Sequence, residues 1–278
     1  MIKADKYYIE NLNDILLQNN IDENPRPSYK DGTKAHTKFI TQVFEKYDIS
    51  KGEFPITTLR NTAIKTGIKE ILWIYQKQTS SLKDARELGV NWWDNWDIGD
   101  DTIGQRYGAT VKRWNLMDKL LNNLETNPFG RRHIMDLWQE QDISEKGGLD
   151  SCAFMTMWTP RKVDGVMYLD MTLTQRSQDA IMATYINKTQ YVALQMMVCK
   201  HLGFEIGVFS HMVQNYHIYD RHIDACNELL ARDPLDFQPT MKLNVPNRTN
   251  FYTIKMEDFE IVTSKDIKKI ESELEIAI

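Results

Sequence analysis

The chain has no long hydrophobic run, and this excludes several classes of protein. No apolar stretch approaches the roughly 20 residues that a membrane-spanning helix needs. The segment from Met1 to Tyr7 lacks the apolar core of a signal peptide. The three cysteines are an odd number without metal-ligand spacing, so neither a disulfide framework nor a metal site is expected. We therefore expect a cytoplasmic protein without a metal.

The chain also lacks linkers, repeats and an excess of basic residues. It contains no stretch rich in proline, glycine and serine, and no low-complexity segment. A net charge of -5 argues against a general nucleic-acid binder, and we expect no DNA partner. With 42% hydrophobic and 26% charged residues, the chain is able to bury a large core. We expect one domain over residues 1–278.

Hydrophobic periodicity predicts both helices and strands. Apolar residues recur at helical spacing in three segments, 8–16, 64–75 and 114–124. Strict alternation in 167–174 predicts a strand with one buried face. Four other segments look extended: 133–138, 153–158, 204–211 and 251–256. Segment 187–201 is apolar on most sides and predicts a buried central helix, in which Met196 and Met197 fill the core. Helices and strands that do not strictly alternate indicate an α+β fold.

Cys152 is the cysteine most suited to chemistry. A lone cysteine is usually a small buried apolar residue, and Cys199 and Cys226 fit that description because both lie on apolar helix faces. Cys152 fits it less well, because it follows the turn-like segment 147–151 and stands among polar residues at the start of a predicted strand. A nearby arginine would favour its thiolate, which is the nucleophilic form.

Four arginines occur in turns or at strand ends: Arg26, Arg131, Arg132 and Arg176. Adjacent arginines on a surface turn are usually only solvated. A guanidinium is nevertheless a fork that matches phosphate oxygens in two places at once. Together, in a net-acidic chain, these four side chains predict a site for an anion.

Other polar residues suit recognition of a nucleotide. Asn187, at the start of the predicted central helix, either caps that helix or presents to a base an amide that both donates and accepts. His217 and Tyr219 point the same way in a strand, where they either bind a ribose hydroxyl or are satisfied core residues. Glu70 is either exposed at a rim or buried with a raised pKa, the state suited to proton relay. The aromatic segment 92–96 is core by default and is able to wall a flat heterocycle.

Taken in order, these groups resemble the thymidylate synthase family over nearly the whole chain. The matching landmarks are Arg26 with 31–33, 54–58, 70–73, 93–96, 104–108, 127–128 with Arg131 and Arg132, Cys152, 175–177 with Asp179, Asn187, 217–219 and 275–278. Segment 190–197 is similar to the version found in Firmicute enzymes. The resemblance implies a homodimeric α+β domain with a large mixed β-sheet that forms the dimer interface and is surrounded by helices.

The resemblance also implies an activity and a role for each landmark. The enzyme would convert dUMP to dTMP, with 5,10-methylenetetrahydrofolate giving the carbon and the hydride, after Cys152 attacks C6 of the uracil. The phosphate would be held by Arg26, Arg176 and Ser177, and by Arg131 and Arg132 of the other subunit. Around the pyrimidine, the implied roles are base reading by Asn187, ribose binding by His217 and Tyr219, water organisation by Glu70 and help at C5 by Tyr107. On the folate side, the implied residues are Asp179 at the pterin, Trp93 in the wall and Ile278 in a closing C-terminus.

The sequence departs from the family pattern near the ring and the folate. Ser151 stands where a proline is common before the nucleophile, and Ala153 where many members have histidine. Leu59 replaces a usual lysine. Segment 180–186 replaces a glycine-rich stretch, and 213–215 replaces Gly-Gly-Asp.

Two alternatives stay open on the sequence alone. A pyrimidine-nucleotide hydroxymethylase of the same superfamily would use the same attack by Cys152 and end with water in place of hydride. Asn187 favours uracil over cytosine, and Trp93 together with the closing C-terminus favours methylation. A non-catalytic protein that binds a nucleotide or RNA is the second alternative, and the intact Cys152, Arg176 and Asn187 argue against it.

Overall fold

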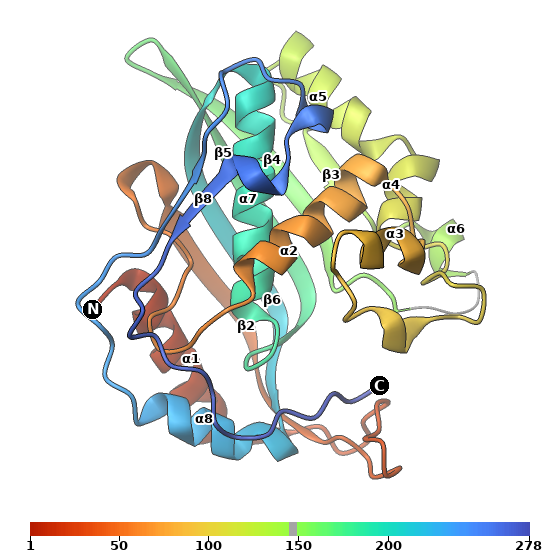
Figure 1. The fold of residues 1–278 in the computed structure, drawn as a ribbon, viewed down its shortest axis with the longest axis vertical. Coiled ribbons are helices and arrows are strands. Elements are labelled where there is room, and N and C mark those ends of the chain that lie inside the picture. The colour runs from red at the N-terminus through yellow and green to blue at the C-terminus, as the bar shows by residue number, and fades with distance from the viewer. Residues whose placement is uncertain (145–148) are drawn as a thin grey trace.

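The computed structural model describes residues 1–144 and 149–278, so Gly147 and Gly148 of the predicted turn lie outside the described residues (Figure 1). Within them, six strands form one sheet in the order β1 (Asn20–Ile21), β2 (Thr37–Asp48), β6 (Glu205–Tyr219), β5 (Val166–Asp179), β4 (Ala153–Val163) and β3 (Ile134–Asp136). The β5–β6 pair is parallel and the other neighbours are antiparallel. The predicted large mixed sheet is therefore confirmed.

Helices surround this sheet. They are α1 (Lys3–Gln18), α2 (Ile64–Ile71), α3 (Leu82–Glu87), α4 (Gly108–Arg113), α5 (Leu116–Thr126), α6 (Glu140–Ile143), α7 (Thr184–Leu202) and α8 (Ile223–Leu230). Figure 1 shows α7 lying against the sheet, where it contacts β5 and β6 on one side and α2 on the other. A second, two-stranded sheet pairs β7 (Thr240–Leu243) with β8 (Phe259–Val262). Among the described residues, no helix combines the length and apolarity that crossing a bilayer requires.

Most of the predicted elements occur in the structure. Met196 and Met197 are buried in α7, as expected for core residues of a central helix. The predicted helix over 64–75 is α2 followed by a π-helical turn at Leu72–Lys77. The alternation in 167–174 belongs to β5, whose Leu169, Met171 and Leu173 are fully buried. Only Ile134–Asp136 of the predicted segment 133–138 is a strand.

One local prediction is wrong, and one of the two alternatives for Asn187 is excluded. Segment 251–256 is not extended, because the side chain of Asn250 accepts a hydrogen bond from the backbone of Tyr252 and starts a 3-10 turn at Phe251–Thr253. Asn187 does not cap the central helix, because α7 begins at Thr184 and its N-cap is Ala183. Asn187 therefore lies within the first turns of α7, with its side chain available for another purpose.

The sheet has two unlike faces. The face toward α7 carries the core residues of β5. On the alternate positions, Phe44 of β2 is 57% exposed and its register partner Met212 of β6 is 39% exposed. Farther along the sheet, Met157 of β4 is 38% exposed and its partner Ile134 of β3 is 53% exposed. Large apolar side chains thus lie at the surface on the second face.

A buried ion pair ties α7 to β2. Lys188 Nζ lies 2.6 Å from Glu45 Oε2, and both side chains are almost fully buried. Glu45 also accepts hydrogen bonds from Tyr47 Oη at 2.5 Å and from Asn11 Nδ2 at 2.9 Å. Because these groups satisfy the buried carboxylate, they fix the helix turn that carries Asn187 against the sheet.

Candidate active site

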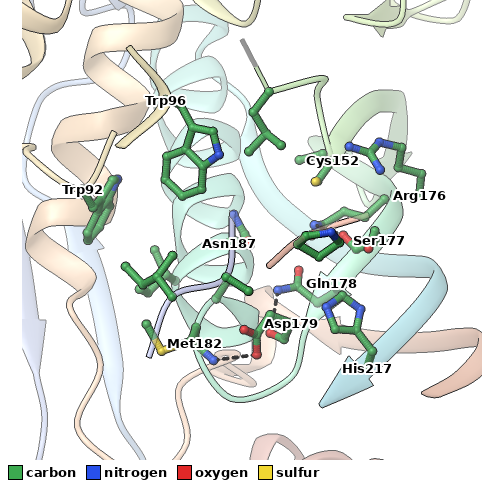
Figure 2. A pocket seen from close by; sticks show the side chains of 18 of the residues that line it. Trp92, Trp96, Cys152, Arg176, Ser177, Gln178, Asp179, Met182, Asn187 and His217 are labelled. Carbon is green, nitrogen blue, oxygen red and sulfur yellow. Dashed lines mark hydrogen bonds between the residues drawn. The ribbon is translucent and has the colours of Figure 1, made fainter. Parts of the chain in front are cut away.

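A cavity of about 540 Å³ opens beside the carboxyl ends of β5 and β6 (Figure 2). Its volume is within the range of small-molecule sites. Twelve of the residues predicted from the sequence line it: Arg26, Glu70, Trp93, Tyr107, Cys152, Arg176, Ser177, Asp179, Asn187, His217, Tyr219 and Ile278. Arg131 and Arg132 do not line it and are exposed on the turn before β3. The fold therefore gathers in one cavity groups that lie as far apart in the chain as Arg26 and Ile278.

Cys152 stands directly before β4 and is half-buried at the cavity wall. Its backbone N–H donates to the hydroxyl of Tyr107 over 3.2 Å, and its Sγ lies 3.9 Å from the carbonyl oxygen of Asp150. Burial raises the pKa of the Cys152 thiol, Asp150 adds to that rise, and Arg176 and Arg26 oppose it. The arginines favour the thiolate as predicted, but burial outweighs them.

Arg176 is fixed beside the cysteine. Its Nη2 donates to the carbonyl oxygen of Asp150 at 2.8 Å, and its Nε donates to that of Ser151 at 3.2 Å. Ser177 follows on β5 and lines the same wall (Figure 2). Arg26 reaches the cavity from the loop before β2 and is exposed. Two guanidinium groups that both act electrostatically on Cys152 thus line the cavity together with Ser177, an arrangement suited to an anion such as phosphate.

Asn187 and Gln190 face the cavity from the same side of α7. They are three residues apart on a helix, and Asn187 Nδ2 donates to Gln190 Oε1 over 3.0 Å. Gln178, on β5, also lines the cavity: its Nε2 donates to the carbonyl of Asp179, while its Oε1 is buried without a partner among the described residues. An amide pair and an unsatisfied acceptor suit a polar ring with donors and acceptors along its edge.

Glu70 lines the cavity and is buried with a raised pKa, so the second of its two predicted states is correct. Its Oε2 accepts a hydrogen bond from Trp92 Nε1 at 2.5 Å. Burial raises the pKa of Glu70 from 4.5 to about 7, because it outweighs the polar contacts from Trp92, Gln190 and Trp93. A carboxyl group that titrates near neutral pH is suited to exchange protons with a substrate.

His217 and Tyr219 lie on β6, with ring centroids 5.1 Å apart, and both line the cavity. His217 Nδ1 lies 3.0 Å from Asn215 Oδ1, and burial lowers the pKa of His217, which favours the neutral ring. Asp179, at the end of β5, accepts hydrogen bonds at Oδ1 from the backbone of Ile181 at 2.8 Å and of Met182 at 2.9 Å (Figure 2).

The opposite wall is aromatic and apolar. Trp92 and Trp96 are half-buried and flank the cavity (Figure 2). Trp93 is buried, and its ring contacts those of Trp96 and Tyr107 edge-on, with centroids 5.5 and 5.0 Å away. Met182 and Ile186, from the stretch that departs from the family pattern, also line the cavity. Such a wall suits a flat heterocycle, as segment 92–96 suggested.

The C-terminus joins the cavity wall through its backbone. Ile278 N donates to the carbonyl of Ser28 at 3.0 Å, and Ser28 N donates to the carbonyl of Ile278 at 2.8 Å. Arg221 holds Glu275 in an ion pair of 2.6 Å. The last residues therefore lie against the loop that carries Arg26.

Sequence reasoning assigned no role to several lining residues. Gln175, Gln178, Gln190 and Asn215 all line the cavity. The positions of two of them relative to predicted residues could have identified them. Gln190 is about one helical turn from Asn187, and Asn215 is two residues from His217 and so shares its face of the strand. In residues 1–144 and 149–278, no group of three or more His, Cys, Asp or Glu side chains is placed to hold a metal ion.

Comparison with known proteins agrees with this geometry. The family model described as thymidylate synthase matches residues 6–276. The chain is 52% identical over 270 residues to the thymidylate synthase of Streptococcus pneumoniae (strain 70585), covering 96% of this chain and 97% of that one. It is 51% identical over 270 residues to that of Streptococcus sanguinis (strain SK36), with the same coverage. The structure matches the thermostable thymidylate synthase A from Bacillus subtilis with a TM-score of 0.87 and 31% identity, over 99% of both chains. With its sequence, fold and cavity in agreement, the chain belongs to the thymidylate synthase family.

Proposed function

We propose that the protein converts dUMP to dTMP with 5,10-methylenetetrahydrofolate as its second substrate, and that Cys152 is the nucleophile. The observation that supports this most directly is that one cavity brings together a cysteine, an arginine suited to bind a phosphate and an amide suited to hydrogen-bond the edge of a base. Cys152, Arg176 and Asn187 come from the start of β4, from β5 and from α7, and all three line the same space (Figure 2).

The reaction begins with the sulfur of Cys152. Its thiolate forms a bond to C6 of the uracil, and the electron pair of the C5–C6 double bond moves to C5 and the adjoining carbonyl. Arg176 and Arg26 favour the thiolate electrostatically. The phosphate of dUMP is held by the same two arginines and by Ser177, so the nucleotide and the nucleophile are positioned together.

The base and the sugar are read by groups on α7 and β6. The Asn187 amide donates to O4 and accepts from N3–H of uracil, and its neighbour Gln190 orients it through the hydrogen bond of 3.0 Å. His217 and Tyr219 bind the ribose 3′-hydroxyl at the other side of the cavity. His217 acts as a neutral ring, because burial lowers its pKa.

The folate supplies the one-carbon unit and the hydride that together become the methyl group. The aromatic wall fits its ring system, with Trp93 packed behind Trp96. Asp179 bonds to the pterin, and the buried acceptor Gln178 Oε1 is a further polar contact available in that region. Ile278 and the last residues cover the site and exclude water.

Glu70 and Tyr107 handle the proton that leaves C5. Glu70 organises waters near the pyrimidine and exchanges protons near neutral pH, because its pKa is raised to about 7. The hydroxyl of Tyr107 lies at the backbone of Cys152 and orients the attacked side of the ring. Both side chains are buried, so their proton transfers are shielded from bulk water.

The enzyme acts as a homodimer in which the second face of the sheet is the interface. The exposed Phe44, Met157, Met212 and Ile134 on that face support this arrangement, because apolar side chains of this size favour burial against a second copy. Arg131 and Arg132 are exposed at the edge strand β3 and reach the phosphate in the partner's cavity. We further propose that residues 1–278 form one domain, which the continuous family match over 6–276 supports, and that the enzyme works in the cytoplasm, where its thiol stays reduced.

The test is a spectrophotometric assay with dUMP and methylenetetrahydrofolate. We expect the near-ultraviolet absorbance of dihydrofolate to rise with the wild-type enzyme and not with Cys152→Ser, while dUMP binding in that variant stays close to wild type. Release of the C5 hydrogen without dihydrofolate would instead mean a hydroxymethylase. Nucleotide binding with neither signal would mean a non-catalytic protein. Normal turnover by Cys152→Ser would remove Cys152 from the nucleophile role.

A further inference from the structure

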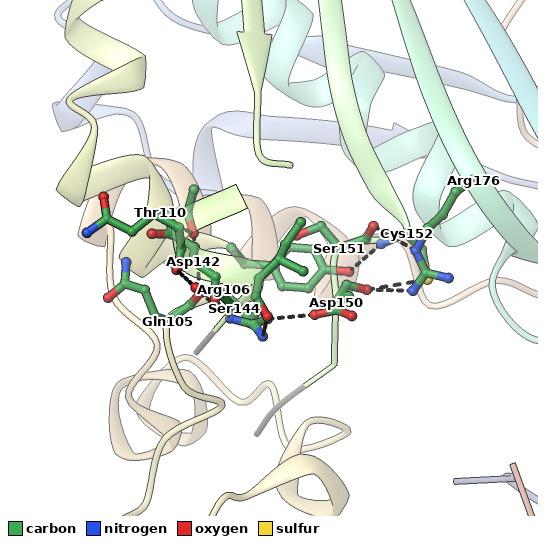
Figure 3. A network of polar contacts seen from close by, with 12 residues as sticks. Gln105, Arg106, Thr110, Asp142, Ser144, Asp150, Ser151, Cys152 and Arg176 are labelled. Atoms are coloured by element: carbon green, nitrogen blue, oxygen red, sulfur yellow. Dashed lines mark hydrogen bonds and ion pairs between the residues drawn. The ribbon is translucent and has the colours of Figure 1, made fainter. Parts of the chain in front are cut away.

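A network of polar contacts centred on Arg106 lies beside the nucleophile (Figure 3). The Arg106 side chain is only 5% exposed, and its Nε forms an ion pair with Asp150 Oδ1 at 2.9 Å. Its Nη1 donates to the carbonyls of Gln105, at 2.9 Å, and of Asp142. Its Nη2 donates to the carbonyl of Ile143 at 3.4 Å. One buried guanidinium therefore joins the end of α6 to the segment that leads into Cys152.

Asp150 connects this network to the reacting atom. Its carboxylate is held by Arg106, and its carbonyl oxygen accepts from Arg176 Nη2 at 2.8 Å. The same carbonyl lies 3.9 Å from Cys152 Sγ. Arg106 thus binds the side chain of Asp150 and Arg176 binds its backbone carbonyl. The sulfur of Cys152 lies near that same carbonyl. A shift of Asp150 would move both the sulfur and the phosphate-binding arginine.

The support behind Arg106 is itself rigid. The Asp142 carboxylate, in α6, accepts from Thr110 Oγ1 at 2.6 Å and from Trp114 Nε1 at 3.2 Å, and it pairs with Arg113 at 3.0 Å. These three partners belong to α4 and the residue after it. Because α6 is fixed to α4 in this way, the Asp142 and Ile143 carbonyls that receive Arg106 have defined positions.

Charge gives Arg106 a second effect on the cysteine. The charged groups that act on Cys152 are Arg176, Arg26 and Asp150. The phenols of Tyr107, directly before α4, and of Tyr219, on β6, also interact electrostatically with it. Asp150 is the anion among them and opposes formation of the thiolate. A cation bonded directly to the Asp150 carboxylate reduces that opposition.

We propose that Arg106 is a positioning residue for the reaction: by holding the Asp150 carboxylate, it sets the place of Cys152 Sγ and of the Arg176 guanidinium relative to the nucleotide. This inference rests on the proposed role of Cys152 as nucleophile. Arg106 does not line the cavity, and acts through Asp150.

The test compares Arg106→Gln, Asp150→Asn and the double variant with the wild type. The rate of alkylation of Cys152 by iodoacetamide is measured against pH, with the modified peptide identified by mass spectrometry, alongside kcat and KM. For Arg106→Gln we expect the alkylation midpoint to rise by about half a pH unit, because Asp150 is left without its cation. We expect kcat to fall by about tenfold to a hundredfold, as for a misplaced reacting group, and the KM for dUMP to rise because Arg176 shares Asp150.

The single and double variants separate charge from position. In Asp150→Asn the midpoint falls, because the anion is gone, but kcat still falls, because the grip of Arg106 is lost. In the double variant the alkylation midpoint returns toward the wild-type value, because the cation and the anion are both removed, while kcat stays low, because the contact between them is still absent. Arg106→Lys keeps the charge but not the fork, so it leaves the midpoint near the wild-type value and lowers kcat.

Arg248→Gln is the control, because it removes another arginine–carboxylate pair, with Glu125 at the surface, and neither residue lines the cavity or contacts Arg106. We expect it to leave kcat and the alkylation midpoint unchanged. Folded Arg106→Gln and Asp150→Asn enzymes with wild-type kcat and midpoint would overturn the proposal. If Arg106→Gln does not fold, Asp150→Asn carries the test from the other end of the contact. A wild-type protein that formed no dihydrofolate would refute the proposed function, whereas the alkylation profiles would still report on Arg106.

Discussion

The hydroxyl oxygen of Tyr107 accepts a hydrogen bond from the backbone N–H of Cys152, with 3.2 Å between the two atoms. The backbone of Tyr107 has a φ of 47°, in a region that residues other than glycine rarely adopt. The next residue, Gly108, packs so closely on Thr79 that an added Cβ would collide with its backbone. A strained, tightly packed turn therefore places the phenol next to Cys152. Such backbone strain is typical of functional sites.

Tyr107→Phe should lower kcat with little change in the KM for dUMP. The variant leaves the Cys152 N–H without its acceptor, which costs about 1–3 kcal/mol where the group is buried. Steady-state kinetics and thermal unfolding measure the two effects. Tyr252→Phe is the control, since it removes a phenol contact to Asp118 at the surface and should leave kcat unchanged. A wild-type kcat in Tyr107→Phe would show that the hydroxyl has no part in the reaction.

Asn187→Asp should shift preference from dUMP toward dCMP. The carboxylate accepts where the amide donates, so it disfavours O4 of uracil and favours the amino group of cytosine. We expect the ratio of kcat/KM for dCMP to that for dUMP to rise by about tenfold or more. The measurement is turnover of each nucleotide under the same conditions. If the ratio stays at the wild-type value, another residue reads the base.

Glu70→Gln should lower kcat and remove a rise of activity through neutral pH. The pKa of Glu70 is raised to about 7, so its carboxylate, the form that accepts protons, develops as the pH passes through that value. The glutamine does not titrate, and the kcat–pH profile of the variant should be flat across this range. A wild-type profile that survives in Glu70→Gln would assign the ionisation to another group.

The same substitution should change how stability depends on pH. The folded-state pKa of Glu70 lies above the unfolded value, so the folded protein binds more protons between about pH 4.5 and 7. The stability that this proton binding contributes to the folded state is fully present below about pH 4.5 and is lost as the pH rises to about 7. The loss amounts to about 3 kcal/mol, at about 1.4 kcal/mol per pKa unit. Relative to the wild type, Glu70→Gln should therefore gain stability as the pH rises, as measured by urea unfolding at several pH values. A parallel pH dependence in both proteins would contradict the buried, titrating carboxyl.

Lys188→Met should destabilise the fold by about 3–5 kcal/mol, because it leaves Glu45 buried without its cation. The double variant Glu45→Met with Lys188→Met should recover much of that loss, since it removes both buried charges. Urea unfolding of the single and double variants measures the coupling. Equal losses for Lys188→Met and the double variant would mean that the ion pair is not the source of the effect.

Arg131 and Arg132 are predicted to serve the partner's cavity, and mixed dimers test this. A Cys152→Ser chain and an Arg131→Gln, Arg132→Gln chain should each be nearly inactive alone. Unfolded together in equal amounts and refolded, they should recover about a quarter of wild-type activity, because half the dimers are mixed and each mixed dimer has one complete site. Failure to recover activity, with mixed dimers present, would place both arginines in their own subunit's site. Full activity of the Arg131→Gln, Arg132→Gln chain alone would place them outside the reaction.

Much of the site followed from local pattern. Alternation along β5 indicated which residues face the core, and the short stretch from Arg176 to Asp179 carries four of the lining residues. The helical period identified α7, although its start was placed three residues late, because its N-cap is Ala183, a residue without a capping side chain. The 3-10 turn at Phe251–Thr253 was missed because a single side-chain contact from Asn250 outweighed the strand-like composition.

What the sequence by itself determined is the kind and order of the chemical groups: one cysteine at a strand boundary, arginines in turns, an amide on an apolar helix and a match to one family over residues 6–276. The tertiary structure decided their environments. Folding buries Glu70. It also joins segments that are far apart in the chain, by the backbone pairing of Ile278 with Ser28 and by the ion pair of Arg106 with Asp150. A pKa or a contact of this kind depends on desolvation and on neighbours brought together by folding, and no local pattern encodes either of them.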